Sequence, residues 1–249
     1  MKDDSSSKPH SKAYSRRKFI GVCSAAMALL SASSRAVSAP LLAFERVLLV
    51  DELDKPIQAQ HLEKEREYVF FYPYVSTPVF LLDLGKPTTA VDLRTESGQA
   101  YRWRGGIGPN RSIVAFCAIC AHRMSHPTAA VSFIGYREQP VGFLDDHNQV
   151  MRRSSVIQCC SEHSIYDPAQ GARVLSGPAP QPLAAIALDD TDGLIYASGV
   201  YGGVLYERFF ENFGFRLGLE FGPERVQQKV TKTTLVKPMD DYTRQRIQC

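Results

Sequence analysis

Short apolar runs separated by turn-forming residues dominate the chain after residue 40. The runs are rich in Val, Ile, Phe and Tyr, with Gly, Pro, Asn or Asp between them; they are Phe44–Val50, Tyr68–Tyr74, Val79–Leu84, Ser112–Cys117, Val156–Cys160 and Leu194–Ala197. Runs of this length and composition are typical of β-strands. The pattern therefore predicts a mainly β, antiparallel domain from about Tyr68 to Gly199, preceded by one or two added strands.

A helical period is visible only near the C-terminus. Its apolar positions would share one face of a helix: Val204, Leu205, Phe209, Phe210, Phe213, Phe215 and Leu217. We expect this helix to cover the β domain, with a contact between Phe209–Phe215 and a partner or a membrane as the alternative. After Gly222 the chain turns polar, and we expect a mobile tail or an arm there.

The first 39 residues follow a different pattern from the rest. A polar stretch to Ser15 is followed by Arg16-Arg17 and then by an apolar stretch from Phe19 to about Ala32. This order resembles the twin-arginine export signal of bacteria. The apolar stretch is shorter than the ~20 residues that span a bilayer. The resemblance implies a periplasmic protein, anchored in the inner membrane only if the signal is retained, and many proteins on this route take up a metal cofactor before they cross.

The charge of the chain changes once this signal region is set aside. Residues 1–39 hold seven of the 29 Lys and Arg residues but only two of the 26 Asp and Glu residues. The remainder has 22 basic and 24 acidic residues, a net charge of −2 instead of the formal +3 of the whole chain. A slightly acidic body without a dense run of cations argues against nucleic-acid binding. The 44% of hydrophobic residues is ordinary for a globular protein of one or two domains.

Two short segments each place a histidine close behind a cysteine. The first, CAICAHRMSHP, contains Cys120 and His122 with one residue between them. The second, CCSEHSIYDP, contains Cys160 and His163 with two residues between them. Two thiolates and two neutral imidazoles can hold either a tetrahedral zinc ion or a two-iron cluster in which Cys₂ binds one iron and His₂ the other.

The order and spacing of these two boxes resemble those of the Rieske iron–sulfur family. The resemblance continues through YDPAQGARVLSGPAPQPL, residues 166–183, where an aromatic-Asp turn and a strand lead to a proline-rich loop. It implies a Rieske-type antiparallel β-sandwich with cluster-binding loops and one [2Fe–2S] cluster. The chain then divides into a signal region (1–39), an N-terminal extension (40–67), a Rieske domain (68–200) and a C-terminal extension (201–249) of a helix followed by a polar tail.

The resemblance also implies roles for individual residues. Cys120 and Cys160 would bind the inner iron, while His122 and His163 would bind the outer, more exposed iron. The neutral histidines would raise the reduction potential into the range of roughly −150 to +300 mV. Further residues around the cluster follow from the same comparison: Ser164 and Tyr166 as hydrogen-bond donors to sulfur, and Pro178 and Pro180 in the loop that keeps water out.

The second box departs from the family pattern in its cysteines. The family's respiratory members join the two boxes by a disulfide, and the matching positions here are Ser125 and Glu162. Cys117 and Cys159 are left over; they either form a disulfide in place of the missing one or remain buried thiols. A shifted alignment would make Cys159 the ligand, but we expect Cys160 because it keeps the Cys-x-x-His spacing.

Three functions fit these observations. The first is an exported one-electron transfer protein that takes electrons from a quinol or a redox partner protein, and the second is a Rieske redox subunit of a larger respiratory or arsenite-oxidase-like oxidoreductase. The third is a zinc-stabilised binding protein that uses Cys117, Cys120, Cys160 and His163. A Rieske ring-hydroxylating oxygenase is disfavoured, because only 86 residues follow His163, too few for the separate domain that would hold a mononuclear iron. We expect an electron-transfer protein or an oxidoreductase subunit rather than a stand-alone catalyst.

Overall fold

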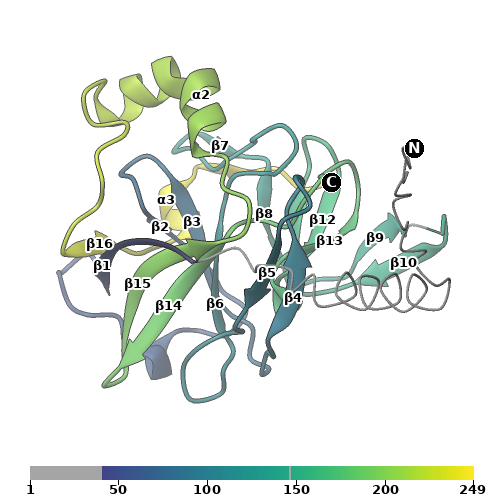
Figure 1. The fold of residues 1–249 in the computed structure, drawn as a ribbon, viewed down its shortest axis with the longest axis horizontal. Helices are drawn as coiled ribbons and strands as arrows, with labels where there is room; N and C mark the ends of the chain where they lie inside the picture. Colours follow the sequence, from purple (N-terminus) through teal and green to yellow (C-terminus); the bar gives the residue numbers. More distant parts are fainter. Residues whose placement is uncertain (1–40, 146) are drawn as a thin grey trace, which may run out of the picture. The chain divides into compact units, whose positions relative to one another are not determined.

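An eight-stranded sheet forms the centre of this protein, whose computed structural model describes residues 41–145 and 147–249. Its strand order is β16-β1-β15-β14-β6-β3-β2-β17, and all pairs except the parallel β1–β16 pair are antiparallel (Figure 1). The strands are β1 (Leu42–Val50), β2 (Glu67–Phe71), β3 (Pro78–Asp83), β6 (Ile113–Cys117), β14 (Ala185–Thr191), β15 (Leu194–Tyr201), β16 (Thr233–Leu235) and β17 (Lys237–Pro238). The expected signal region, residues 1–39, lies outside the described residues.

A second, four-stranded sheet carries the second cysteine box. It consists of β8 (Ile134–Arg137), β11 (Val156–Cys159), β12 (Ser164–Asp167) and β13 (Arg173–Ser176), in the order β13-β12-β11-β8. Smaller pairs are β4 (Val91–Arg94) with β5 (Ala100–Trp103), β9 (Val141–Leu144) with β10 (Val150–Arg153), and β7 (Val131–Ser132) with β18 (Gln245–Arg246). The helices are η1 (Ala59–His61), η2 (Pro168–Gln170), α2 (Tyr206–Phe221) and α3 (Met239–Tyr242).

The central strands are buried on both faces. In β3, Val79 and Leu81 belong to one hydrophobic cluster, while Phe80 and Leu82 belong to another. Successive side chains of a strand point to opposite faces of its sheet, so the two clusters fill the two sides of the large sheet. This burial explains why the central strands have continuous apolar sequences rather than alternating ones. The prediction of a mainly β, antiparallel fold is confirmed.

Helix α2 covers one side of the large sheet. Tyr206, Phe209 and Leu217 are buried in the same cluster as Val79 and Leu81. The sequence prediction of a C-terminal helix is confirmed, but Phe215 is 86% exposed and does not belong to the apolar face. Among the described residues no helix is long and apolar enough to cross a membrane.

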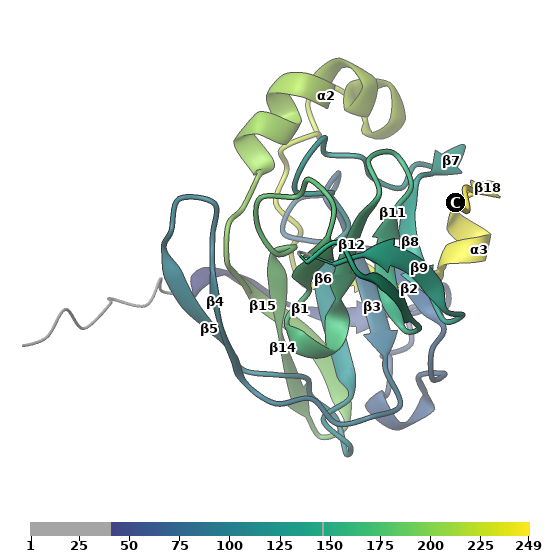
Figure 2. The same ribbon diagram turned by 90° about the vertical axis from the view of Figure 1, so that its right-hand side faces the viewer.

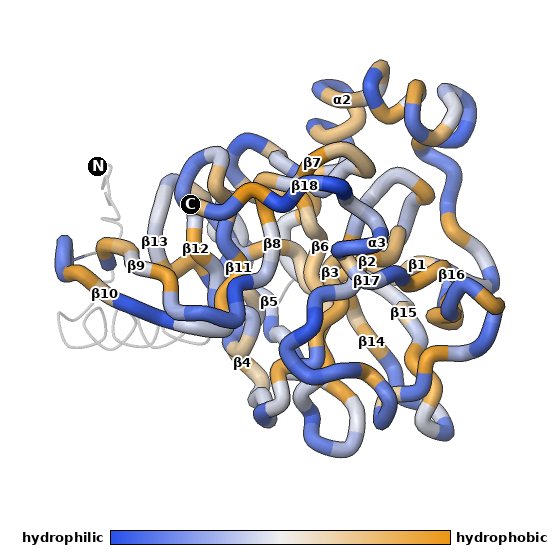
Figure 3. The backbone as a smooth tube through the Cα atoms, turned by 180° about the vertical axis from the view of Figure 1, so that it is seen from behind, coloured by the Kyte–Doolittle hydropathy of each residue, from blue (hydrophilic) through white to orange (hydrophobic). Residues whose placement is uncertain are grey.

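The polar segment after Gly222 is an arm with regular secondary structure, the second of the two outcomes, a mobile tail or an arm, that its composition suggested. It contains β16, β17, α3 and β18, and its backbone is mostly hydrophilic around α3 and β18 (Figure 3). Pairing of main-chain groups and charged contacts hold this arm in place. Arg246 forms an ion pair with the buried carboxylate of Glu67, and Arg137 donates a hydrogen bond to the carbonyl of Ile247. Contacts of this kind do not require regularly spaced apolar residues, so the sequence of the arm shows no hydrophobic period.

Replacing Glu67 by Gln is expected to make the free energy of unfolding less dependent on pH, because the wild type loses stability as the pH rises and Glu67 gives up its proton. Burial raises the pKa of Glu67 from its ordinary value of 4.5 to about 7, so the folded protein holds this proton more tightly than the unfolded chain does. The stabilising effect of this proton is complete below pH 4.5 and is lost as the pH rises through about 7, a change of about 3 kcal/mol. Denaturant unfolding at a series of pH values should show the wild type losing stability relative to Glu67→Gln over this range. Parallel curves for the two proteins would contradict the raised pKa of Glu67.

Candidate metal centre

The first cysteine box forms a tight loop after β6. The Cys120 amide donates a hydrogen bond to the Ser125 carbonyl at 2.9 Å, and the Met124 amide donates to the Cys120 carbonyl, also at 2.9 Å. These two bonds fold the loop back on itself, with Met124 at a positive φ of 57°. Cys120 is fully buried at the base of the loop, whereas the side chain of His122 is 30% exposed. The loop thus presents one buried sulfur and one partly exposed imidazole.

Helix α2 supports this loop from the side. The ring of His126 makes edge-to-face contacts with Phe209 and Phe213, at centroid distances of 4.8 and 4.9 Å. Its Nδ1 lies 2.9 Å from the Met124 carbonyl, which can only accept, so Nδ1 carries the proton. Burial lowers the pKa of His126, which favours the neutral ring. Figure 2 shows α2 next to the loop between β6 and β7. The Phe-rich helix therefore positions the first cysteine box.

The second box forms the connection between β11 and β12. Cys159, the last residue of β11, pairs across the two strands with Ser164, the first residue of β12. Both side chains are fully buried. Between them, Glu162 is about one-third exposed and His163 is exposed at a positive φ of 58°.

The two boxes bring Cys120 and Cys159 together. The Cys159 thiol donates a hydrogen bond to Cys120 Sγ, which lowers the pKa of Cys120 and raises that of Cys159. The Tyr166 hydroxyl lies 3.3 Å from Cys120 Sγ and accepts a hydrogen bond from the Ala121 amide at 3.2 Å. Because the amide occupies the acceptor side of this hydroxyl, its proton is free to point at the sulfur. The predicted role of Tyr166 as a donor to a cysteine sulfur matches this geometry.

Two buried polar atoms next to the cysteine pair have no hydrogen-bond partner. They are Ser164 Oγ and His122 Nδ1. Buried polar atoms are almost always satisfied, and one that is not calls for an explanation such as a bound ion. The Ser164 hydroxyl is a donor and the neutral imidazole nitrogen a metal ligand, so both fit a [2Fe–2S] cluster with bridging sulfides and a histidine-bound iron.

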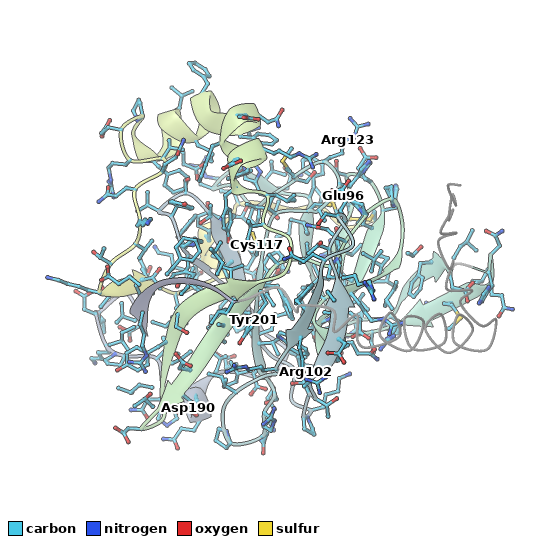
Figure 4. All side chains as sticks on the ribbon, in the orientation of Figure 1. Glu96, Arg102, Cys117, Arg123, Asp190 and Tyr201 are labelled. Atoms are coloured by element: carbon cyan, nitrogen blue, oxygen red, sulfur yellow. A yellow bond between two sulfur atoms is a disulfide. The ribbon has the colours of Figure 1, made fainter. Side chains whose placement is uncertain are left out.

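The outer part of the candidate centre contains His122 and Glu162. His122 Nδ1 lies 3.9 Å from Glu162 Oε2, and Glu162 Oε1 lies 3.4 Å from Arg123 Nε. Figure 4 shows Arg123 at the surface of the protein, with Cys117 in its interior. Within residues 41–145 and 147–249, no group of three or more His, Cys, Asp or Glu side chains converges on one point. The candidate ligands form two pairs, a buried one of sulfurs and a partly exposed one of nitrogen and oxygen.

The expectation that Cys160 is a ligand is wrong. Cys160 forms a disulfide with Cys249, with 5.7 Å between their Cα atoms, so it offers no thiolate. Cys159 and Cys160 are successive residues at the end of a strand and face opposite sides. Cys159 faces the core, and Cys160 faces the C-terminal arm, where its Sγ lies 3.6 Å from the Ile247 carbonyl oxygen.

The suggested disulfide between Cys117 and Cys159 is also wrong, since both are free thiols. Cys117 belongs to the cluster under α2, whereas Cys159 belongs to the cluster on the other side of the large sheet. Burial raises the pKa of Cys117 to about 12, so it remains a protonated thiol. The zinc site built from Cys117, Cys120, Cys160 and His163 is excluded for the same reasons.

The proline-rich loop lies against the second box. Pro178 and Pro180 are exposed, while Ala179 between them is buried. A Cβ on Gly177 would lie 2.6 Å from the His163 carbonyl oxygen, so the two loops touch at a position where only glycine fits. Gln181 accepts a hydrogen bond from the amide of Glu96 and donates one to the carbonyl of Gly203, at 2.9 and 2.8 Å. This loop therefore packs against the backbone of the second cysteine box.

The sequence points to Cys120, His122, Ser164 and Tyr166 but leaves two further residues unpredicted. Glu162 stands where the family has a cysteine, and no spacing in the sequence links Cys249 to Cys160. The neighbouring pair Cys159-Cys160 was the available signal, because one of the two had to face away from the centre.

No model of a known protein family matches the chain. Among solved structures, it is similar to the soluble domain of the Rieske protein II (soxF) from Sulfolobus acidocaldarius. The two are 26% identical, with a TM-score of 0.45, and the similarity covers 69% of this chain and 85% of the other.

Proposed function

We propose that this protein transfers single electrons through a [2Fe–2S] cluster, with Cys120 and Cys159 as ligands of the inner iron. The observation that carries the proposal is the buried pair of thiols beside the Tyr166 hydroxyl. Held by these residues, such a cluster would supply one-electron chemistry, the interconversion of Fe³⁺ and Fe²⁺ at one iron. The unpartnered atoms Ser164 Oγ and His122 Nδ1 support the proposal, because each would gain a partner.

The surrounding residues would tune and expose this centre. Burial of Cys120 and Cys159 would keep water from an iron bound there, and the hydrogen bond from Tyr166 to Cys120 would favour a reduced, more negative state. His122, about one-third exposed, gives an electron donor or acceptor a short route to the centre. A quinol or a reduced protein carrier is the donor class that we infer.

The same proposal includes export and partners. The resemblance of residues 1–39 to a twin-arginine signal supports a periplasmic location after loading of the cluster. A retained signal would hold the protein at the inner membrane. Function as the redox subunit of a larger oxidoreductase is the alternative, in which catalysis belongs to the assembly.

Replacing Tyr166 by Phe is expected to lower the reduction potential. The variant loses one hydrogen bond to a ligand sulfur that is stronger in the reduced state. A shift of about 40 mV follows if the two redox states differ by roughly 1 kcal/mol in this bond, since ~59 mV is a tenfold change for one electron. Potentiometric titration followed by low-temperature EPR would measure it and would also show whether a one-electron signal appears on reduction.

Tyr101→Phe is the matched control for this experiment. Tyr101 is buried in the same hydrophobic cluster as Tyr166, and its hydroxyl has no hydrogen-bond partner. Its variant should keep the wild-type potential. Equal reduction potentials for Tyr166→Phe and wild type would show that Tyr166 does not tune the centre. The absence of an EPR signal on reduction of the wild type would contradict the proposed function.

A further inference from the structure

The position of Cys159 changes the identity of the fourth ligand. The resemblance to the Rieske family implies a second outer ligand three residues after the second inner cysteine. Counted from Cys160, that residue is His163; counted from Cys159, it is Glu162. Since Cys160 is held in a disulfide and Cys159 lies against Cys120, the count starts at Cys159.

We propose that Glu162, not His163, is the fourth ligand, so that two cysteines, one histidine and one carboxylate hold the cluster. This inference rests on the function proposed above. Carboxylate oxygens and imidazole nitrogens bind iron together in many protein sites. A ligand set of Cys120, Cys159, His122 and Glu162 therefore uses ordinary iron chemistry.

The contact between His122 and Glu162 has the geometry of two ligands of one ion. Their separation of 3.9 Å, from Nδ1 to Oε2, is too long for a hydrogen bond. Two ligand bonds of about 2.0–2.2 Å each place their donor atoms about 3–4 Å apart. The Nδ1 atom is also buried and has no hydrogen-bond partner. A metal ion between the two side chains would satisfy both.

Arg123 positions the carboxylate for this role. Its Nε lies 3.4 Å from Oε1 of Glu162, the oxygen that does not face His122. This contact turns Oε2 toward the imidazole and offsets part of the negative charge of the carboxylate. Since the Arg123 side chain is 67% exposed, its contribution to stability is small, and orientation is its main effect.

His163 lies on the outside of the same turn. It is exposed, and the next residue, Ser164, is fully buried. Its positive φ of 58° reverses the chain direction at this residue, and its carbonyl packs against Gly177 of the proline-rich loop. The backbone of His163 therefore shapes the turn, while its side chain is directed to solvent.

A carboxylate ligand changes the charge of the centre. With two thiolates, one imidazole and one carboxylate, the oxidised cluster carries a net charge of about −1 and the reduced cluster about −2, one unit more negative than with two histidines. Reduction is therefore harder than in a centre with two histidines. Glu162→His should raise the reduction potential above that of the wild type.

Pulsed EPR of the reduced protein tests this inference by counting nitrogen atoms bound to iron. We expect one histidine nitrogen coupling in the wild type, the same spectrum and iron content in His163→Ala, and a second coupling in Glu162→His. Glu162→Ala should lose iron, whereas Glu138→Ala, a change of an exposed glutamate at the end of β8, should not.

The possible failures are distinguishable. Two nitrogen couplings in the wild type, one of which disappears in His163→Ala, would overturn the carboxylate ligand and leave the proposed function intact. A purified protein that contains zinc and no sulfide would overturn both. Full iron content and an unchanged spectrum in Glu162→Ala would also exclude Glu162 as a ligand.

Discussion

Serine in place of Cys120 or Cys159 is expected to remove the cluster entirely. Both side chains are fully buried and face each other, so the loss of either sulfur leaves the inner iron with one protein ligand. Iron and sulfide in each purified variant should fall from about two of each per chain to near zero. Quantitative iron and sulfide analysis of proteins purified without oxygen measures this change.

Cys117→Ser and Cys160→Ser are the controls for this experiment. Cys117 is equally buried but faces the opposite side of the large sheet, and Cys160 is bonded to Cys249. Both variants should keep their iron and sulfide. A Cys160→Ser protein without cluster, together with a Cys159→Ser protein that retains it, would reverse the assignment of the second inner ligand.

Replacing Cys249 by Ser is expected to cost about 4–5 kcal/mol of unfolding free energy in the oxidised protein. The disulfide closes a loop between residues 89 apart in the sequence, and cross-links over long loops restrict the unfolded chain most. The C-terminal arm would keep its contacts through Arg246 and Glu67 but would no longer be tied to the second cysteine box. Denaturant unfolding of wild type and variant measures the difference.

The partner cysteine supplies the control for the disulfide. Cys160→Ser should have the same effect as Cys249→Ser, and the double variant should be no less stable than either single one. Adding a thiol reductant should lower the free energy of unfolding of the wild type to that of the variants. Additive losses in the double variant, or a wild type and a Cys249→Ser protein of equal stability without reductant, would contradict the disulfide.

Much of the fold was readable in the sequence because the central strands are buried on both faces. The apolar runs that became β3 and β6 pack between the two hydrophobic clusters, so their composition alone marks them as strands. The strands of the C-terminal arm could not be predicted from the sequence, because β16, β17 and β18 have two or three residues each. Main-chain pairing and the ion pair of Arg246 with Glu67 hold the arm, and neither produces an apolar pattern.

The sequence predicts much of the candidate site but does not decide which of the adjacent residues Cys159 and Cys160 belongs to it. Local spacing identified Cys120, His122 and Tyr166, which the structure brings into one region. Cys159 and Cys160 differ in the side of β11 that they face, and a shift of one residue reverses this choice. The pairing of Cys160 with Cys249 depends on the path of the distant arm, which sequence spacing does not reveal.

The central claim is that the buried pair of Cys120 and Cys159 holds a [2Fe–2S] cluster. Metal and acid-labile sulfide analysis of the wild-type protein, purified without oxygen, tests it most directly. We expect about two iron and about two sulfide per chain, with no stoichiometric zinc. One zinc per chain without sulfide would contradict it.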